Sequence, residues 1–189
     1  MAAHEFEQVH STEELDPSQS ANGLEFDPSN APQEPDPSFD NDPAHFDSQL
    51  EKVLALARGQ IGKKEQPCGT GRNPYSSYFG FEGQPWCADF VAWCFDQAED
   101  KDHKVPWGYP SAVRNVVNWA RANDLIGDAF SGSIFAYPNN AHMGLITGAE
   151  RTRFETIEGN TIGADGTTCW VTTLVRNTGG DYVFIRWPS

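Results

Sequence analysis

Cys87 is the residue of this sequence with the strongest capacity for chemistry. It stands in the segment 83–95, which reads Gly-Gln-Pro-Trp-Cys-Ala-Asp-Phe-Val-Ala-Trp-Cys-Phe. Pro85 favours the first turn of a helix, and the spacing predicts a helix from about Pro85 to Gln97. Free backbone amides and the helix dipole stabilise negative charge in a first turn, which favours a nucleophilic thiolate. Cys87 is therefore a candidate nucleophile, and the alternative is a residue that only packs.

A thiol nucleophile needs a base, and the chain has five histidines. His4, His10 and His45 lie in or beside an acidic N-terminal segment, and His103 lies in a charged run typical of a solvated loop. The remaining histidine, His142, follows two asparagines that favour a turn and opens the strand pattern of residues 143–147. We expect its imidazole to lie at the end of a sheet, where it can serve Cys87 as base.

The imidazole must also be held by an acceptor on its second nitrogen. An apolar run ends at Glu158, and Gly159 and Asn160 follow it. If this strand neighbours the strand of His142, Glu158 or Asn160 can reach the ring. The same pattern occurs at ordinary strand ends, and the sequence leaves the choice between the two residues open.

The elements that position these residues change type along the chain. A capping box, Ser48 with Glu51, begins an amphipathic helix over residues 48–61, and a third helix is predicted from about Ser111 to Gly127 at the latest. Helices first and strands second predict an α+β domain in which helices pack on one face of an antiparallel sheet. Five runs rich in β-branched and aromatic residues predict the strands: 134–137, 143–147, 154–158, 170–175 and 182–186.

The composition divides the chain into two parts. Of its 189 residues, the first 47 hold twelve acidic side chains and no Lys or Arg, whereas the rest hold fifteen acidic and thirteen basic side chains. Residues 1–46, which repeat Asp-Pro-Ser three times, are predicted to be a disordered acidic tail, and residues 47–189 a single folded domain. The nearly neutral domain gives no reason to expect nucleic acid as a partner, and we expect a monomer.

The sequence has no apolar run long enough to span a membrane and no signal-peptide pattern at its start. Its four cysteines are too irregularly spaced for a disulfide scaffold or a zinc ribbon, so neither a metal nor a cofactor is predicted. Cys94 lies roughly 10 Å along the helix from Cys87, too far for a bridge, and is assigned to the core. A bridge between Cys68 and Cys169 remains open.

The order of these motifs resembles the CHAP family, the cysteine- and histidine-dependent amidohydrolases and peptidases. The likeness rests on Trp-Cys-Ala-x-Phe-Val-x-Trp around Cys87, on His-x-Gly at His142 and on Ile-Glu-Gly-Asn sixteen residues later. It covers most of residues 50–187, including the lead-in at 73–80. The resemblance implies a papain-like fold with Cys87 as nucleophile, His142 as base, and the family's third and fourth polar residues at Glu158 and Asn160.

Two further expectations concern the surroundings of Cys87. In papain-like enzymes a polar residue just upstream of the cysteine helps to bind the oxyanion, and Gln84 stands there in this chain. Three aromatic residues, Tyr78, Trp86 and Trp107, either line a groove for sugar and peptide or belong to the core. The sequence does not decide between these two roles.

Members of the CHAP family mostly cleave bacterial peptidoglycan, as N-acetylmuramoyl-L-alanine amidases or as peptide-stem endopeptidases. The resemblance implies a Cys–His thioester mechanism at the bacterial cell wall. Because the sequence shows no signal-peptide pattern, we expect a phage-encoded or virion-borne protein, or delivery by a secretion or injection system. The acidic calcium loop of some phage members is absent, so no calcium is expected, and residues 130–133 replace a Pro-Gly-Asp turn. The alternatives are a catalytically inactive peptidoglycan-binding module and a cysteine protease effector that acts on protein.

Overall fold

The computed structural model describes residues 48–98, 105–109 and 111–187. The predicted tail at residues 1–46 and four of the five histidines, including His103, lie outside the described residues. The described part carries every candidate site residue named above.

Four helices precede the strands: α1 (Ser48–Arg58), α2 (Pro74–Tyr78), α3 (Cys87–Ala98) and α4 (Val113–Ala122). The three longer ones correspond to the predicted helices, with α3 beginning two residues after Pro85. Helix α2 lies in a segment for which the sequence predicted no helix. It forms because the Asn73 side chain accepts hydrogen bonds from the backbone amides of Tyr75 and Ser76, and because Pro74 suits the first helical position.

The strands form one six-stranded sheet in the order β1-β6-β2-β3-β4-β5, and every neighbouring pair is antiparallel. Their bounds are β1 (Ile126–Gly127), β2 (Ile134–Ala136), β3 (Met143–Ala149), β4 (Arg153–Ile162), β5 (Thr168–Asn177) and β6 (Val183–Ile185). The five predicted strands are all present. Only β1 was missed, because two residues carry no periodicity. The domain is therefore α+β, with its helices before its strands.

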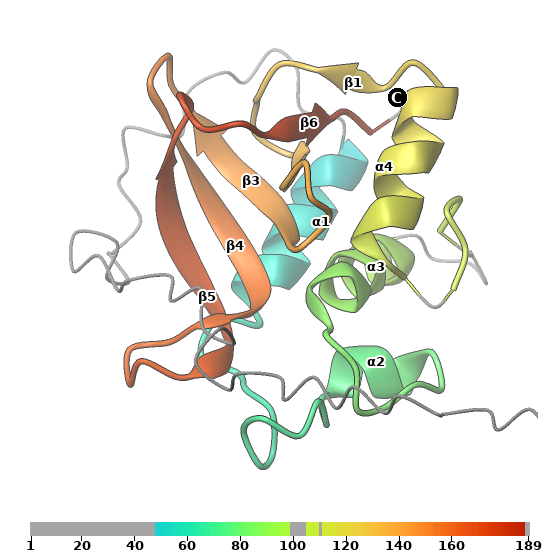
Figure 1. Cartoon of the computed structure of the whole chain (residues 1–189), viewed down its shortest axis with the longest axis vertical. Coiled ribbons are helices and arrows are strands. Elements are labelled where there is room, and N and C mark those ends of the chain that lie inside the picture. The colour runs from blue at the N-terminus through green and yellow to red at the C-terminus, as the bar shows by residue number, and fades with distance from the viewer. Residues whose placement is uncertain (1–47, 99–104, 110, 188–189) are drawn as a thin grey trace, which may run out of the picture.

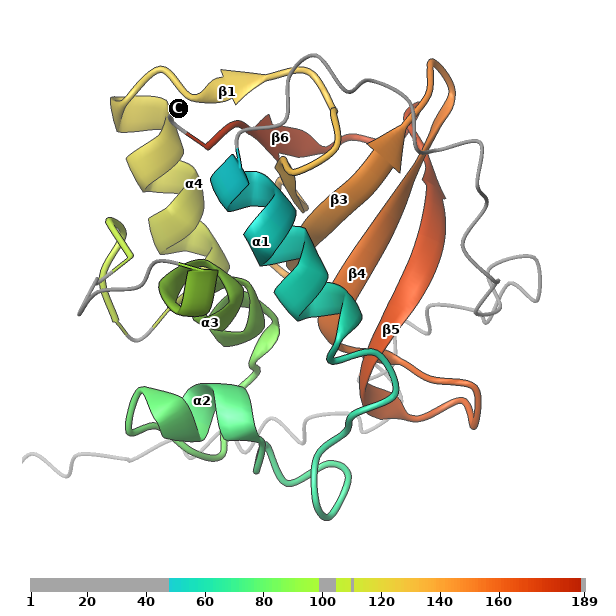
Figure 2. The same ribbon diagram turned by 180° about the vertical axis from the view of Figure 1, so that it is seen from behind.

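The helices α1, α3 and α4 pack together on one face of the sheet, and α2 lies beyond the start of α3 (Figures 1 and 2). The main core lies between these layers and takes alternate sheet residues such as Leu145 and Ile157. The intervening strand residues point to the other face of the sheet, where a second small cluster is formed by Phe135, Ile146 and Phe154. No helix of the described part is long and apolar enough to cross a membrane.

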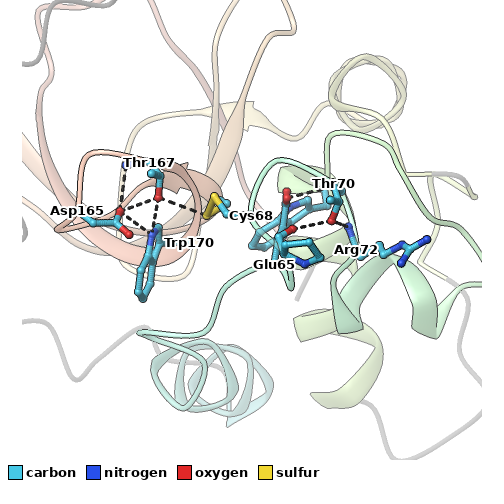
Figure 3. The surroundings of a disulfide bond; sticks show 11 residues. Glu65, Cys68, Thr70, Arg72, Asp165, Thr167 and Trp170 are labelled. Carbon is cyan, nitrogen blue, oxygen red and sulfur yellow. Dashed lines mark hydrogen bonds between the residues drawn. A yellow bond between two sulfur atoms is a disulfide. The ribbon is translucent and has the colours of Figure 1, made fainter.

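A disulfide joins Cys68 in the loop after α1 to the buried Cys169 of β5, across a sequence separation of 101 residues (Figure 3). Glu65 stands in the same loop, and its backbone amide donates to the Cys169 carbonyl at 3.0 Å. The loop is therefore held to the sheet by both a covalent bond and a hydrogen bond. The remaining two cysteines, Cys87 and Cys94, are free and buried.

Candidate active site

Cys87 is the first residue of α3, so it stands where the backbone amides of a helix lack intrahelical partners. The helix begins here because the Trp86 carbonyl accepts from the Phe90 amide at 2.9 Å and starts the helical hydrogen-bond series. The Cys87 residue retains 4% of its surface, against none for Cys94, which lies in the core. Both free thiols of α3 are thus buried, and of the two only Cys87 stands in the first turn of the helix.

His142 immediately precedes β3, at the end of the sheet as predicted. Its Nε2 lies 2.7 Å from Oε2 of Glu158. The Cys87 side chain lies close enough to the ring to raise the pKa of His142. Burial lowers the pKa of His142, but the hydrogen bonds to Cys87 and Glu158 and the charges of both raise it more, to about 9. The ring is therefore an imidazolium at neutral pH.

Glu158 is fully buried, and all its polar contacts suit a carboxylate. Arg176 of β5 donates to it twice, from Nε to Oε1 at 2.7 Å and from Nη2 to Oε2 at 2.6 Å, and the Thr156 hydroxyl donates to Oε1. Burial raises the pKa of Glu158, but the charge of Arg176 and the hydrogen bonds from His142 and Arg176 hold it far below its usual range. Glu158 therefore remains ionised and orients the imidazole.

Two glycines, one beside His142 and one beside Glu158, occupy positions where a side chain would not fit. A Cβ on Gly144, in His-x-Gly, would lie 2.7 Å from Cγ of Glu158 and 2.8 Å from Cε1 of Phe135. A Cβ on Gly159, in Ile-Glu-Gly-Asn, would lie 2.6 Å from both Cζ3 of Trp86 and Cβ of Phe90. Gly144 thus admits the Glu158 side chain beside β3, and Gly159 lets the start of α3 rest on β4.

Asn160 does not share the position of Glu158. Strand β4 continues beyond Glu158 to Ile162 through an irregularity between Glu158 and Thr161, and Asn160 has a left-handed backbone there, with φ 57°. Within the described part of the chain its half-buried side chain makes no hydrogen bond. The structure therefore brings Glu158 to the ring and leaves Asn160 at the strand irregularity.

Residues that precede α3 in the chain hold its first turn through hydrogen bonds to Asp89. The buried Asp89, in the first turn of α3, accepts from the Ser76 hydroxyl of α2 and from Nε2 of Gln84, each at 2.7 Å. A carboxylate only accepts hydrogen bonds, so it fixes which end of the Gln84 amide faces it. The other N–H of that nitrogen remains available to a ligand. Gln84 is thus held by its contact with Asp89, three residues before Cys87.

The three aromatic residues take different positions. Trp86 is fully buried: its indole stacks on Tyr75 with centroids 5.3 Å apart and donates to Glu65 at 2.6 Å. Trp107 is 8% exposed and lies in an aromatic cluster with Phe95, Trp119 and Trp187. Both belong to the core. Tyr78 is half exposed, and its hydroxyl donates to Asp96 of α3 at 2.7 Å.

No family model, no characterised protein and no solved structure matches this chain.

The geometry places a thiol at a helix start against an imidazole whose other nitrogen is held by a buried carboxylate. This is the arrangement that activates a cysteine for attack on a carbonyl carbon. The sequence pointed to Cys87, His142 and Glu158 but missed Arg176 and Asp89. Arg176 lies near the end of a strand, where a basic residue is usually solvated, and its contact with Glu158 depends on how β4 and β5 pair.

Proposed function

We propose that this chain is a papain-like cysteine hydrolase that cleaves an amide bond of bacterial peptidoglycan. The observation that carries the proposal is the hydrogen-bonded pair of His142 and the buried Glu158, together with Cys87 at the start of α3, close enough to His142 to raise its pKa. The substrate class rests on the resemblance to the CHAP family, whose motif residues are those that build the site. An oxidising location suits the Cys68–Cys169 disulfide, since such bonds persist outside reducing compartments.

The reaction proceeds as acyl transfer. The Cys87 thiolate attacks the amide carbonyl, and the backbone amide of Cys87 together with the Gln84 side chain binds the oxyanion. The imidazolium of His142 then protonates the leaving amine, which departs as a thioester forms on Cys87. Neutral His142 next removes a proton from water, which attacks the thioester; the carboxylic acid is released, and Cys87 returns to the thiolate beside the imidazolium of His142.

Digestion of purified peptidoglycan tests the proposal. Mass spectrometry of the products identifies the cleaved bond, because an amidase frees the amine of the first stem residue and an endopeptidase frees an amine within the stem. Cys87→Ala should abolish the release, and its circular dichroism should match that of the parent. Product release by Cys87→Ala at the parental rate would disprove the assignment of the nucleophile.

A protein substrate is the other outcome that this assay distinguishes. If the wall remains intact while a denatured protein is cut in a manner that depends on Cys87, the chemistry stands and the substrate class is wrong. If neither substrate is cut but the protein sediments with insoluble peptidoglycan, the fold acts as a binding module.

A further inference from the structure

The site contains a second buried cation, Arg176, that the thioester mechanism does not use. Its guanidinium lies 5.0 Å from the centroid of the Phe135 ring, and its side chain is 15% exposed. Its Nη1 donates to the Tyr137 hydroxyl at 2.7 Å, while Nε and Nη2 face the two oxygens of Glu158. Each of the three guanidinium nitrogens therefore donates a hydrogen bond, which fixes the group in one orientation.

We propose that Arg176 is a positioning residue of the Cys87–His142 pair: it balances the charge of the site so that a thiolate, an imidazolium and the Glu158 carboxylate can be buried together. This inference rests on the proposed function in that it takes Cys87 as the nucleophile. It goes further because it assigns a role to a residue outside the cysteine, histidine and carboxylate set.

The argument is one of charge. With the thiolate formed, the site holds two negative groups, Cys87 and Glu158, and two positive groups, His142 and Arg176. Without the arginine, forming the thiolate leaves a net negative charge in a place where Glu158 has no exposed surface. Buried net charge is strongly disfavoured, so the site would take up a proton. Protonation of the Cys87 thiolate would remove the reactive species.

The groups that face Arg176 from neighbouring segments support this balance. Glu158 of β4 is its only charged partner among the described residues, and Tyr137, after β2, and Tyr182, before β6, are the other titratable groups beside it. Burial raises the pKa of Tyr137, and a neutral phenol does not alter the sum. His142 is reached only through the carboxylate that the two cations share.

The pH dependence of alkylation at Cys87 tests the proposal without any substrate. The rate of iodoacetamide labelling at Cys87, located by peptide mapping, is measured across pH for the parent, Arg176→Gln, Arg176→Lys and Tyr137→Phe, with circular dichroism as a check of folding. Arg176→Gln keeps a hydrogen-bond donor but removes the charge. It should label at least about tenfold more slowly at about pH 6, because the midpoint of its profile moves up by a unit or more.

Two variants serve as controls for structural damage. Arg176→Lys keeps the charge and loses the double contact, so it should restore labelling to within about threefold of the parent. Tyr137→Phe removes a hydrogen bond from the guanidinium but no charge, and should also label within about threefold. A parental profile in Arg176→Gln, or equal loss in Arg176→Lys, would overturn the role in charge balance.

Removal of the Glu158 charge gives a second test, which does not require the single variant Arg176→Gln, with its unpaired carboxylate, to fold. In Glu158→Gln the thiolate state carries a net positive charge, and in the double variant Glu158→Gln/Arg176→Gln it carries none. Cys87 should therefore label at lower pH in the single variant than in the double, by about one pH unit. Identical midpoints would refute the charge argument.

The outcomes also separate this inference from the proposed function. If the parent leaves peptidoglycan intact but the labelling series runs as expected, the substrate class is wrong and Arg176 keeps its role. If Cys94 labels before Cys87 in the parent, the nucleophile is misassigned and the role of Arg176 fails with it.

Discussion

The two halves of the candidate site are held by different forces. The helix half, which carries Cys87, rests on aromatic stacking, on the Asn73 cap, and on hydrogen bonds from Ser76 and Gln84 to one buried carboxylate. The sheet half, which carries His142, rests on three contacts, His142–Glu158, Arg176–Glu158 and Arg176–Tyr137, whose partners lie 16 to 39 residues apart in sequence. Damage to the helix half should therefore appear first as lost stability, and damage to the sheet half as altered activity and pH dependence.

The sharpest test of the sheet half compares Glu158 with Asn160. Glu158→Gln removes the charge that holds the imidazolium and should lower kcat/KM on peptidoglycan by roughly 10³-fold or more, as the loss of an orienting carboxylate does in other triads. Asn160→Ala should cost less than about tenfold, because among the described residues its side chain makes no hydrogen bond to His142 or Cys87. Equal losses in the two variants would show that Glu158 has no special role. Asn160→Gly, which retains the left-handed backbone freely, separates backbone strain from side-chain loss.

The two motif glycines offer a matched pair across the halves. Gly144→Ala forces Glu158 and Phe135 aside, and Gly159→Ala forces the start of α3 from β4; each should lower the free energy of unfolding by about 1–3 kcal/mol. In addition, Gly144→Ala should lower kcat/KM more than Gly159→Ala relative to the stability lost, because it moves the residue that orients His142. Chemical denaturation and kinetics on the same samples measure both quantities. The comparison fails if the two variants lose activity in the same proportion to stability.

The imidazolium predicts how stability depends on pH. The pKa of His142 is raised from 6.5 to about 9 by folding, so its contribution is complete below 6.5 and is lost as pH rises through about 9. Hydrolysis should decline over the same upper range, because neutral His142 cannot protonate the leaving amine. In Cys87→Ala the pKa of His142 should fall, because the thiol contact that raises it is absent. Proton NMR of the imidazole follows this titration, and an unchanged value in Cys87→Ala would contradict the Cys87–His142 contact.

The sequence predicted the parts of the site that depend on local pattern. Cys87 was placed at a helix start because Pro85 precedes it and a helical apolar pattern follows it. His142 was placed at a strand start because an apolar run follows it directly. The choice between Glu158 and Asn160 could not be made, because it depends on a strand irregularity and on the Gly144 contact. Trp86 could not be assigned to core or groove, since its partner Glu65 lies 21 residues away. Long-range pairing, which local periodicity does not encode, settled these cases.

Removal of the disulfide should affect activity least, although Cys68 lies in the same loop as Glu65, the hydrogen-bond partner of Trp86. In Cys68→Ala/Cys169→Ala the loop that carries Glu65 loses its covalent link to β5, and the free energy of unfolding should fall by about 2–5 kcal/mol. The Glu65 carboxylate still accepts from the Trp86 indole and from the Gly71 amide. The Glu65 backbone amide still donates to the Cys169 carbonyl, a group that the substitution leaves in place. The start of α3 should therefore keep its position, and kcat/KM well below the melting temperature should change by less than about threefold. The matched variant is Glu65→Gln, in which an amide replaces the carboxylate that accepts from Trp86. A larger loss of activity in Glu65→Gln than in the double cysteine variant would show that this hydrogen bond, and not the disulfide, holds the helix half. The reverse order would make the disulfide the support of Cys87.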